Sequence, residues 1–263
     1  MTALLEVTAL AKAYRGVHAV DGVDFSIAAG GITGLIGPNG SGKSTTIDCI
    51  TGFQRLDAGR VLLSGIDITG QPPQRIARAG MVRTFQTVRI YDQFSLLENL
   101  LVVDEPFRSV AWYDALVRGP AYRRANAAAT AHAHELLALV GLTRLTGVPA
   151  GILSYGQKKL LALAATLMSR PKLVVLDEPV AGVNPTRINE VADVLRRVNQ
   201  AGVTFLIVEH NVDFISALCH HVIVFDQGRK LMEGPPEAVH GDQRVLDAYL
   251  GLGDGSIGAM AGA

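Results

Sequence analysis

The sequence predicts an α/β protein built on a parallel β-sheet that has helices on both of its faces. Three observations support this fold class. Apolar strand-like runs alternate with helical runs along most of the chain, which is typical of parallel sheets with crossover helices. The apolar run Ile32–Ile36 leads directly into a glycine-rich loop and then a helix. Between about residues 88 and 170, alanine and leucine dominate and β-branched runs disappear, which predicts an inserted helical subdomain.

The individual elements follow from local patterns. Strands are expected where apolar runs lie between turn residues, and helices where apolar side chains recur on one face, as Val191, Leu195 and Val198 do. We expect residues 1–250 to form a single domain and the glycine- and alanine-rich residues 251–263 to be a flexible tail. The expected strands are Leu4–Ala9, Val23–Ile27, Ile32–Ile36, Arg60–Ser64, Lys172–Leu176, Val203–Val208 and Val222–Phe225, and the expected helices are Lys43–Gly52, Ala125–Val140, Gln157–Arg170, Thr186–Gln200 and Val212–Cys219.

The composition excludes several classes of protein. The chain has 263 residues, 49% hydrophobic and 18% charged, which is enough apolar material for a folded core. Lys+Arg and Asp+Glu each total 24, so the chain lacks the basic footprint of a nucleic-acid binder. No apolar run approaches the roughly 18 residues of a membrane-spanning helix, and the start does not resemble a signal peptide. Cys49 and Cys219 lie among apolar residues and are interpreted as reduced, buried thiols, with a disulfide between them as the alternative.

The first chemical motif is a glycine-rich loop, GPNGSGKST, which fits G-x-x-x-x-G-K-[ST] in full. Glycines let such a loop curl so that several backbone N–H groups converge on a triphosphate, and the next helix points its positive end at the same phosphates. Lys43 adds a positive charge, and Ser44 offers a hydroxyl to Mg²⁺. The motif predicts a nucleoside-triphosphate site formed by Gly37, Pro38, Asn39, Gly40, Ser41, Gly42, Lys43, Ser44 and Thr45.

A second motif, KLVVLDEP, places two carboxylates at the end of an apolar strand. Ligands of open α/β sheets bind at the carboxyl ends of the strands. Asp177 is expected to hold the magnesium ion, and Glu178 to polarise or deprotonate the attacking water. The alternative is that the two acidic residues cap a helix that begins at Pro179.

A third motif indicates the family. LSYGQKK, at Leu153–Lys159, resembles the LSGGQ signature of ABC ATPases, with Tyr155 in place of the first signature glycine. The resemblance implies that a helix N-terminus in this segment faces the γ-phosphate of the nucleotide bound to the opposite subunit. The alternative is that Ser154 is an ordinary cap of the following helix. The matching signature positions are Ser154, Tyr155, Gly156 and Gln157.

Three further positions match the same family. Gln86, in VRTFQT, corresponds to the glutamine loop, which touches the metal and the attacking water. His210, in LIVEHNV, corresponds to the switch histidine, which contacts the γ-phosphate and holds Glu178. Tyr14, in KAYRG, stands where the family has an aromatic ring that stacks on adenine. One departure is AGVN in place of SALD, so Asn184 replaces an aspartate that helps communication across the dimer.

The resemblance covers about residues 5–251 and sharpens the expected fold. It implies a P-loop (RecA-like) core with an N-terminal antiparallel β subdomain and an inserted α-helical ABC subdomain. It also implies ATP as the substrate, Mg²⁺ as the cofactor, and a homodimer or a heterodimer with a related ATPase subunit.

Longer segments resemble one group within the family, the LivG-type subunits of branched-chain amino acid importers. Examples are VRTFQTVRIYDQFSLLENLLV, LDEPVAGVNPT and the ending EGPPEAVHGDQRVLDAYLG. This group implies integral membrane permease subunits, a periplasmic or extracellular solute-binding protein, and a peripheral location on the cytoplasmic face of the membrane. However, IYDQFSLLENL departs from the family's LFPELSVLENV beside the expected membrane-subunit contact.

Other functions remain as alternatives at this stage. Urea or short-amide importers and the ATPase for lipopolysaccharide export have similar motifs. A non-transport ABC ATPase, acting in DNA repair or on ribosomes, is disfavoured by the single ATPase unit, the short helical insertion and the balanced charge. A simple P-loop kinase or switch protein is disfavoured by the signature, glutamine and histidine motifs.

Overall fold

The computed structural model describes residues 3–84, 90–104 and 119–250. The predicted flexible tail, residues 251–263, and Gln86 lie outside these ranges. The strands are β1 (Ala3–Tyr14), β2 (Val17–Ala28), β3 (Ile32–Ile36), β4 (Ala58–Leu63), β5 (Ile66–Asp67), β6 (Met81–Arg83), β7 (Leu173–Asp177), β8 (Thr204–Val208), β9 (His221–Asp226) and β10 (Arg229–Gly234). The α-helices are α1 (Lys43–Ile50), α2 (Pro73–Ala79), α3 (Leu96–Leu101), α6 (Pro120–Leu139), α7 (Tyr155–Leu167), α8 (Ile188–Gln200), α9 (Val212–Leu218), α10 (Pro236–His240) and α11 (Gln243–Leu250). Short 3-10 helices are η1 (Thr143–Leu145), η2 (Ala150–Ile152) and η3 (Pro185–Arg187).

Two β-sheets form the framework of the described chain. One is antiparallel, in the order β2-β1-β4-β5. The other has the order β10-β9-β3-β8-β7-β6, in which every neighbouring pair is parallel except β10 with β9. The predicted parallel sheet and the predicted N-terminal antiparallel β subdomain are both confirmed.

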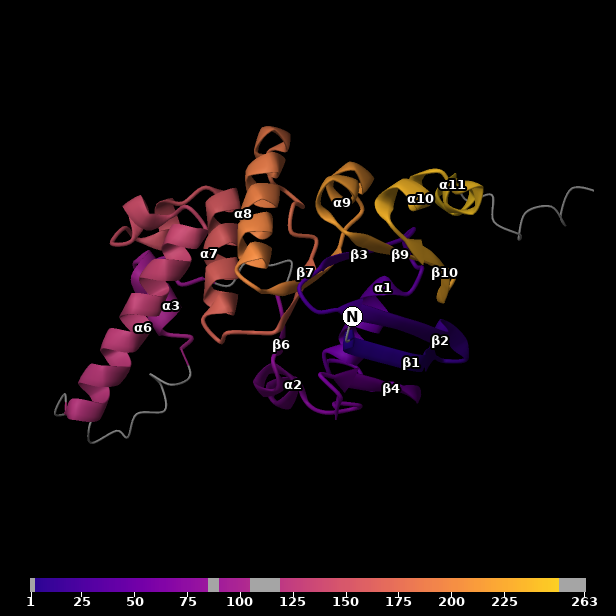
Figure 1. Cartoon of the computed structure of the whole chain (residues 1–263), viewed down its shortest axis with the longest axis horizontal. Coiled ribbons are helices and arrows are strands. Elements are labelled where there is room, and N and C mark those ends of the chain that lie inside the picture. The colour runs from indigo at the N-terminus through magenta and orange to yellow at the C-terminus, as the bar shows by residue number, and fades with distance from the viewer. Residues whose placement is uncertain (1–2, 85–89, 105–118, 251–263) are drawn as a thin grey trace, which may run out of the picture.

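The strands of the parallel sheet are buried on both faces, and their side chains alternate between two apolar cores. Phe205 and Ile207 belong to one core, which also contains residues of α7, α8 and α9. Leu206 and Val208 belong to the other core, which contains residues of α1 and of the antiparallel sheet. Figure 1 shows this layering, with α8 and α9 on one side of β3 and β9, and with β1, β2 and β4 on the other. One face is therefore covered by helices, and the other by α1 together with the antiparallel strands.

Helix α9 packs against the parallel sheet at a glycine of β3. A Cβ atom at Gly34 would lie 2.9 Å from Cγ2 of Ile215 and 3.2 Å from the Cys219 sulfur. The close approach therefore requires glycine, and it buries the Cys219 thiol against the sheet. Both cysteines are buried and free, as the sequence predicts.

Between β6 and β7, the described residues form helices and loops. Helices α3, α6 and α7 pack on one another and extend the core that covers one face of the sheet. Figure 1 shows these three helices as a group at the end of the molecule away from β1, β2 and β4. The helix expected at Ala125–Val140 begins at Pro120, and the one expected at Gln157–Arg170 begins at Tyr155. Within the described ranges, no helix combines the length and apolarity needed to span a membrane.

Candidate functional site

The phosphate-loop residues, the acidic pair and His210 gather where three parallel strands end. Strand β3 lies beside β8, and β8 lies beside β7, so their carboxyl ends meet at one edge of the sheet. The register places Val208 opposite both Leu35 and Asp177. The glycine-rich loop, the acidic pair and His210 follow these three ends. They border one cavity of about 370 Å³, lined by Tyr14, Ala19, Asn39, Gly40, Ser41, Gly42, Lys43, Ser44, Thr45, Asp177, Glu178, Val208 and His210.

The glycine-rich loop has a backbone that only glycine permits at two positions. Gly37 has φ +147°, and a Cβ atom there would collide with the carbonyl oxygen of Phe225. Gly42 has φ +96°, and a Cβ atom there would collide with the carbonyl oxygen of Ala19. Helix α1 begins directly after Gly42, so its free N–H groups and the positive end of its dipole lie at the loop. This is an arrangement that binds anionic oxygen groups.

Lys43 lies inside the loop. Its ammonium group donates hydrogen bonds to the carbonyl oxygens of Gly37 and Pro38, at 2.7 and 2.9 Å, and to Oγ of Ser41 at 3.3 Å. Burial lowers the pKa of Lys43, and the negative charges of Glu178 and Asp177 partly offset this effect. The hydrogen-bond acceptors of the Lys43 ammonium group are neutral oxygens, so a phosphate in the loop would give it a directly bonded anionic partner.

The two acidic residues at the carboxyl end of β7 face different partners. One carboxylate oxygen of Asp177 accepts a hydrogen bond from Nη2 of Arg83 at 2.7 Å, and the same guanidinium binds Asp48 of α1. Glu178 has φ +50°, which is uncommon for a residue with a side chain, and its N–H donates to the carbonyl oxygen of Val208. The alternative of a helix beginning at Pro179 is wrong, because a turn follows the strand there.

Glu178 and His210 come together across the strand ends. Nε2 of His210 lies 3.1 Å from Oε1 of Glu178. The pairing that the family resemblance implied is therefore present in the geometry. A carboxylate held beside an imidazole at the wall of a polar cavity is an arrangement that can orient a water molecule and accept its proton.

Sequence reasoning missed three side chains at this site. Arg83 connects β6 to Asp177, as described above. Glu209 accepts hydrogen bonds from the N–H groups of Val180 and His210, at 2.9 and 3.0 Å. The hydroxyl of Tyr249, on α11, accepts a hydrogen bond from the N–H of Gly37 at 3.0 Å. Two of these residues had a signal in the sequence. Glu209 is a charged residue that directly follows an apolar run, beside His210, and Tyr249 lies near the end of an amphipathic segment.

The signature segment has a different position from the other motifs. Ser154 caps α7: its Oγ accepts from the N–H of Gln157, and the Gln157 side chain accepts from the N–H of Ser154. This capping box confirms the N-cap interpretation of Ser154. The described lining of the cavity contains none of Ser154, Tyr155, Gly156 and Gln157.

Together, these features define a class of protein. A parallel sheet in which β3 leads into a glycine-rich phosphate cradle, and in which β7, the next strand beyond β8, ends in a carboxylate pair, is a P-loop nucleoside triphosphatase fold.

The particular family follows from comparison with known proteins. The profile of the ABC transporter family matches residues 20–181. BraF of Pseudomonas aeruginosa, a high-affinity branched-chain amino acid transport ATP-binding protein, is 36% identical over 249 residues, covering 94% of this chain and 98% of BraF. LivG of Escherichia coli K12, which has the same description, is 35% identical over 249 residues, with the same coverage. The chain belongs to the ABC transporter family, as an ATP-binding and ATP-hydrolysing subunit.

Solved structures agree with this assignment. An ATP-binding cassette of an ABC transporter in its ADP conformation has a TM-score of 0.82 and 34% identity, covering 95% of this chain and 100% of that one. A nucleotide-free cassette has a TM-score of 0.79 and 34% identity, covering 94% and 99%. The family prediction made from the signature motif is confirmed.

Proposed function

We propose that this chain hydrolyses ATP to energise an importer of branched-chain amino acids. The supporting observation is that relatives named as branched-chain amino acid transport ATP-binding proteins match the chain along nearly their whole length. They include bacterial proteins and one from the archaeon Archaeoglobus fulgidus, which is 36% identical over 254 residues and matched over 98% of its length.

In this proposal, residues 37–45 bind the triphosphate. Backbone N–H groups of the loop and of the start of α1 hydrogen-bond the phosphate oxygens. Lys43 exchanges its bonds to the Gly37 and Pro38 carbonyls for the β- and γ-phosphates. Tyr14 borders the same cavity with a partly exposed ring, which supports its stacking on the adenine.

Magnesium would be held by Ser44 and Asp177, together with Gln86. The residues fit the ion, because Mg²⁺ prefers oxygen ligands and usually keeps several waters and phosphate oxygens. Asp177 has one carboxylate oxygen hydrogen-bonded to Arg83, so the other remains for the metal or its water. The chemistry that Mg²⁺ would supply there is neutralisation of the charge that develops on the phosphates.

Glu178 would orient the attacking water and accept its proton. His210 lies within hydrogen-bonding distance of the Glu178 carboxylate and would hold it and contact the γ-phosphate. Phosphoryl transfer depends mainly on positioning and charge stabilisation, so fixing this carboxylate is the main contribution these residues make.

A second subunit would complete the site. The described lining of the chain's own cavity does not include the signature residues Ser154–Gln157. A second copy of the chain, or a related ATPase, would therefore present its own signature residues to the γ-phosphate bound here. Integral membrane permeases and a solute-binding protein would complete the transporter, with this chain on the cytoplasmic face of the membrane.

The Glu178→Gln variant tests the catalytic part. It should bind Mg-ATP with wild-type affinity, lose hydrolysis by at least about 100-fold, and elute from size exclusion as an ATP-dependent dimer. Normal hydrolysis by this variant would refute the role of Glu178. A wild-type chain that turns over at full rate as a monomer would refute the composite site.

An uptake assay tests the cargo. Cells that lack this chain should recover leucine, isoleucine and valine uptake with the wild-type chain and not with Glu178→Gln. Recovery of urea uptake alone would move the chain to the urea or short-amide group, even if the catalytic proposal holds.

A further inference from the structure

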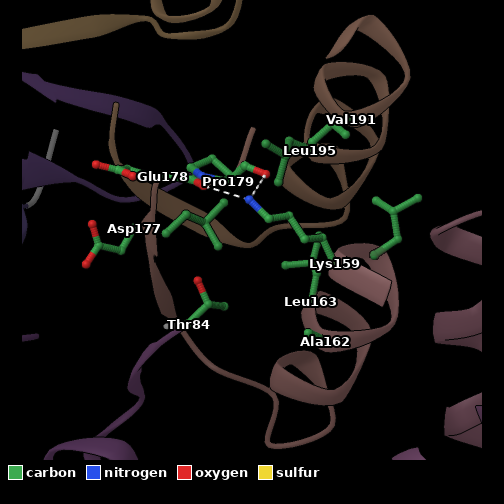
Figure 2. A pocket seen from close by; sticks show the side chains of 11 residues that line it. Thr84, Lys159, Ala162, Leu163, Asp177, Glu178, Pro179, Val191 and Leu195 are labelled. Carbon is green, nitrogen blue, oxygen red and sulfur yellow. Dashed lines mark hydrogen bonds between the residues drawn. The ribbon is translucent and has the colours of Figure 1, made fainter. Parts of the chain in front are cut away.

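The loop formed by residues 178–182 is held by a cation from helix α7. The ammonium group of Lys159 donates hydrogen bonds to the carbonyl oxygens of Glu178, Pro179 and Ala181, at 2.9, 3.1 and 2.7 Å. Figure 2 shows Lys159 reaching from its helix to Glu178 and Pro179. All three donors of the ammonium group are therefore used on one short stretch of backbone.

The surroundings of Lys159 favour a residue with a long apolar stem and a charged end. The stem borders a small, largely apolar cavity of about 50 Å³, whose lining includes Leu163 of α7 and Leu195 of α8. Burial lowers the pKa of Lys159, and the negative charges of Glu209 and Glu178 oppose this effect. The half-buried cation is stable here because the three carbonyl oxygens replace part of its water shell.

Tyr155 supports the same loop from the preceding turn of α7. Its ring centroid lies 5.4 Å from the ammonium nitrogen of Lys159. A Cβ atom at Gly182 would lie 3.2 Å from Cε1 of the ring, and Gly182 has φ +71°. The Tyr155 ring therefore occupies the space beside Gly182, where a side chain would be both crowded and strained.

An anion holds the same loop from the sheet. Glu209, which is buried at the end of β8, accepts the N–H of Val180 through one oxygen and the N–H of His210 through the other. Carbonyl groups of the loop thus face a cation, and one of its N–H groups faces an anion. Left-handed backbone such as that of Glu178 persists where the surrounding structure over-determines it.

We propose that Lys159 is a positioning residue that fixes loop 178–182, with Tyr155, so that the Glu178 carboxylate stays beside His210. The inference rests on the proposed function, because the role of Glu178 belongs to it.

The test compares Lys159→Met with Lys158→Met in the full chain. Both remove one ammonium group from α7, but Lys158 pairs with the surface residue Asp92 at 2.7 Å. Lys159→Met should lower kcat about 10- to 100-fold and change the KM for Mg-ATP less than about two-fold, because the phosphate loop is untouched. Lys158→Met should stay within about two-fold of the wild type in both constants.

Hydrogen–deuterium exchange supplies a readout that does not depend on activity. The N–H groups of Val180 and Val183, both hydrogen-bonded, should exchange at least about ten-fold faster in Lys159→Met than in Lys158→Met. Gly182→Ala perturbs the same loop without altering Lys159, so it should also speed exchange and lower kcat. This variant replaces Lys159→Met in the test if Lys159→Met folds poorly.

Unchanged exchange in Lys159→Met and Gly182→Ala would overturn the inference whatever the ATPase rates are. Faster exchange with a wild-type kcat would also overturn it, because the loop would then not govern hydrolysis. If the wild-type chain itself does not hydrolyse ATP, the proposed function fails, and the exchange data alone decide whether Lys159 holds the loop.

Discussion

A partly buried ion-pair network joins β6, α1 and β7, and its removal should be costly. Arg83, on β6, binds Asp48 of α1 at 2.5 Å and Asp177 of β7 at 2.7 Å. The side chains of Arg83 and Asp177 are 9% and 12% exposed, whereas that of Asp48 is 33% exposed. Arg83→Met would keep much of the side-chain volume but leave two carboxylates near each other without their cation.

The magnitude follows from this burial. Removing one partner of a buried ion pair lowers the free energy of unfolding by about 3–5 kcal/mol, whereas a fully exposed pair contributes at most about 1 kcal/mol. Because Asp48 is one-third exposed, the lower end applies, about 3 kcal/mol. For a domain of this size, each kcal/mol lowers Tm by roughly 2–4 °C, so Arg83→Met should lower Tm by about 6–12 °C.

Thermal and urea unfolding of the full chain, followed by circular dichroism, would measure this loss. Arg60→Met is the matched control, because Arg60 pairs with Asp67 at 2.9 Å with side chains 62% and 46% exposed, and it should cost less than about 1 kcal/mol. Adding Asp48→Asn to Arg83→Met should recover part of the loss, because one of the unpaired carboxylates is then neutral. Equal losses for Arg83→Met and Arg60→Met would refute the reasoning.

Two further predictions concern the phosphate loop and the thiols. Tyr249→Phe removes the acceptor of the Gly37 N–H, so we expect a loss of about 1 kcal/mol in unfolding free energy and a few-fold weaker Mg-ATP binding by calorimetry; wild-type values for both would show that α11 does not support the loop. Burial raises the pKa of Cys49 to about 11 and that of Cys219 to about 12, from 9.0. A raised folded-state pKa stabilises the fold below pH 9 and loses that contribution as the pH rises through these values, so the unfolding free energy should fall above pH 9. Replacing both cysteines with alanine should make the fall of the unfolding free energy with pH shallower. An unchanged slope would show that the two buried thiols do not cause this fall.

The sequence could predict the parallel sheet because its strands are buried on both faces. Such strands appear as short continuous apolar runs, and Ile32–Ile36 coincides with β3. Other elements carry weaker signals. Strand β10 (Arg229–Gly234) is an edge strand with charged side chains, and β6 has only three residues. The start of helix α3 has a signal in the sequence, because Ser95 and Glu98 form a capping box. The alanine- and leucine-rich composition of this region predicts only general helical character, and it does not indicate α3 as a separate helix.

The supporting side chains of the site could not be predicted, because their partners are distant in sequence. Arg83 lies 35 residues from Asp48 and 94 from Asp177. Lys159 contacts a loop about 20 residues away, and that contact depends on how α7 packs against the sheet. Motifs identify groups that touch a ligand directly, because the chemistry of the ligand restricts them. Groups that hold those residues in place are restricted only by the fold.

Two of the departures from the family pattern, Tyr155 and Asn184, illustrate this difference. Considered alone, Tyr155 replaces the first glycine of the signature, and Asn184 replaces an aspartate. In the structure, the Tyr155 ring lies against Gly182, and Oδ1 of Asn184 accepts from the N–H and the hydroxyl of Thr186, at 3.1 and 2.9 Å. Tyr155 therefore lies at the junction between α7 and the segment after β7, which Lys159 also joins, whereas Asn184 makes a local turn contact within that segment. Because a side chain at position 182 would crowd the ring at position 155, the bulky residue at Tyr155 is accommodated by its neighbour in space, which its own motif does not reveal.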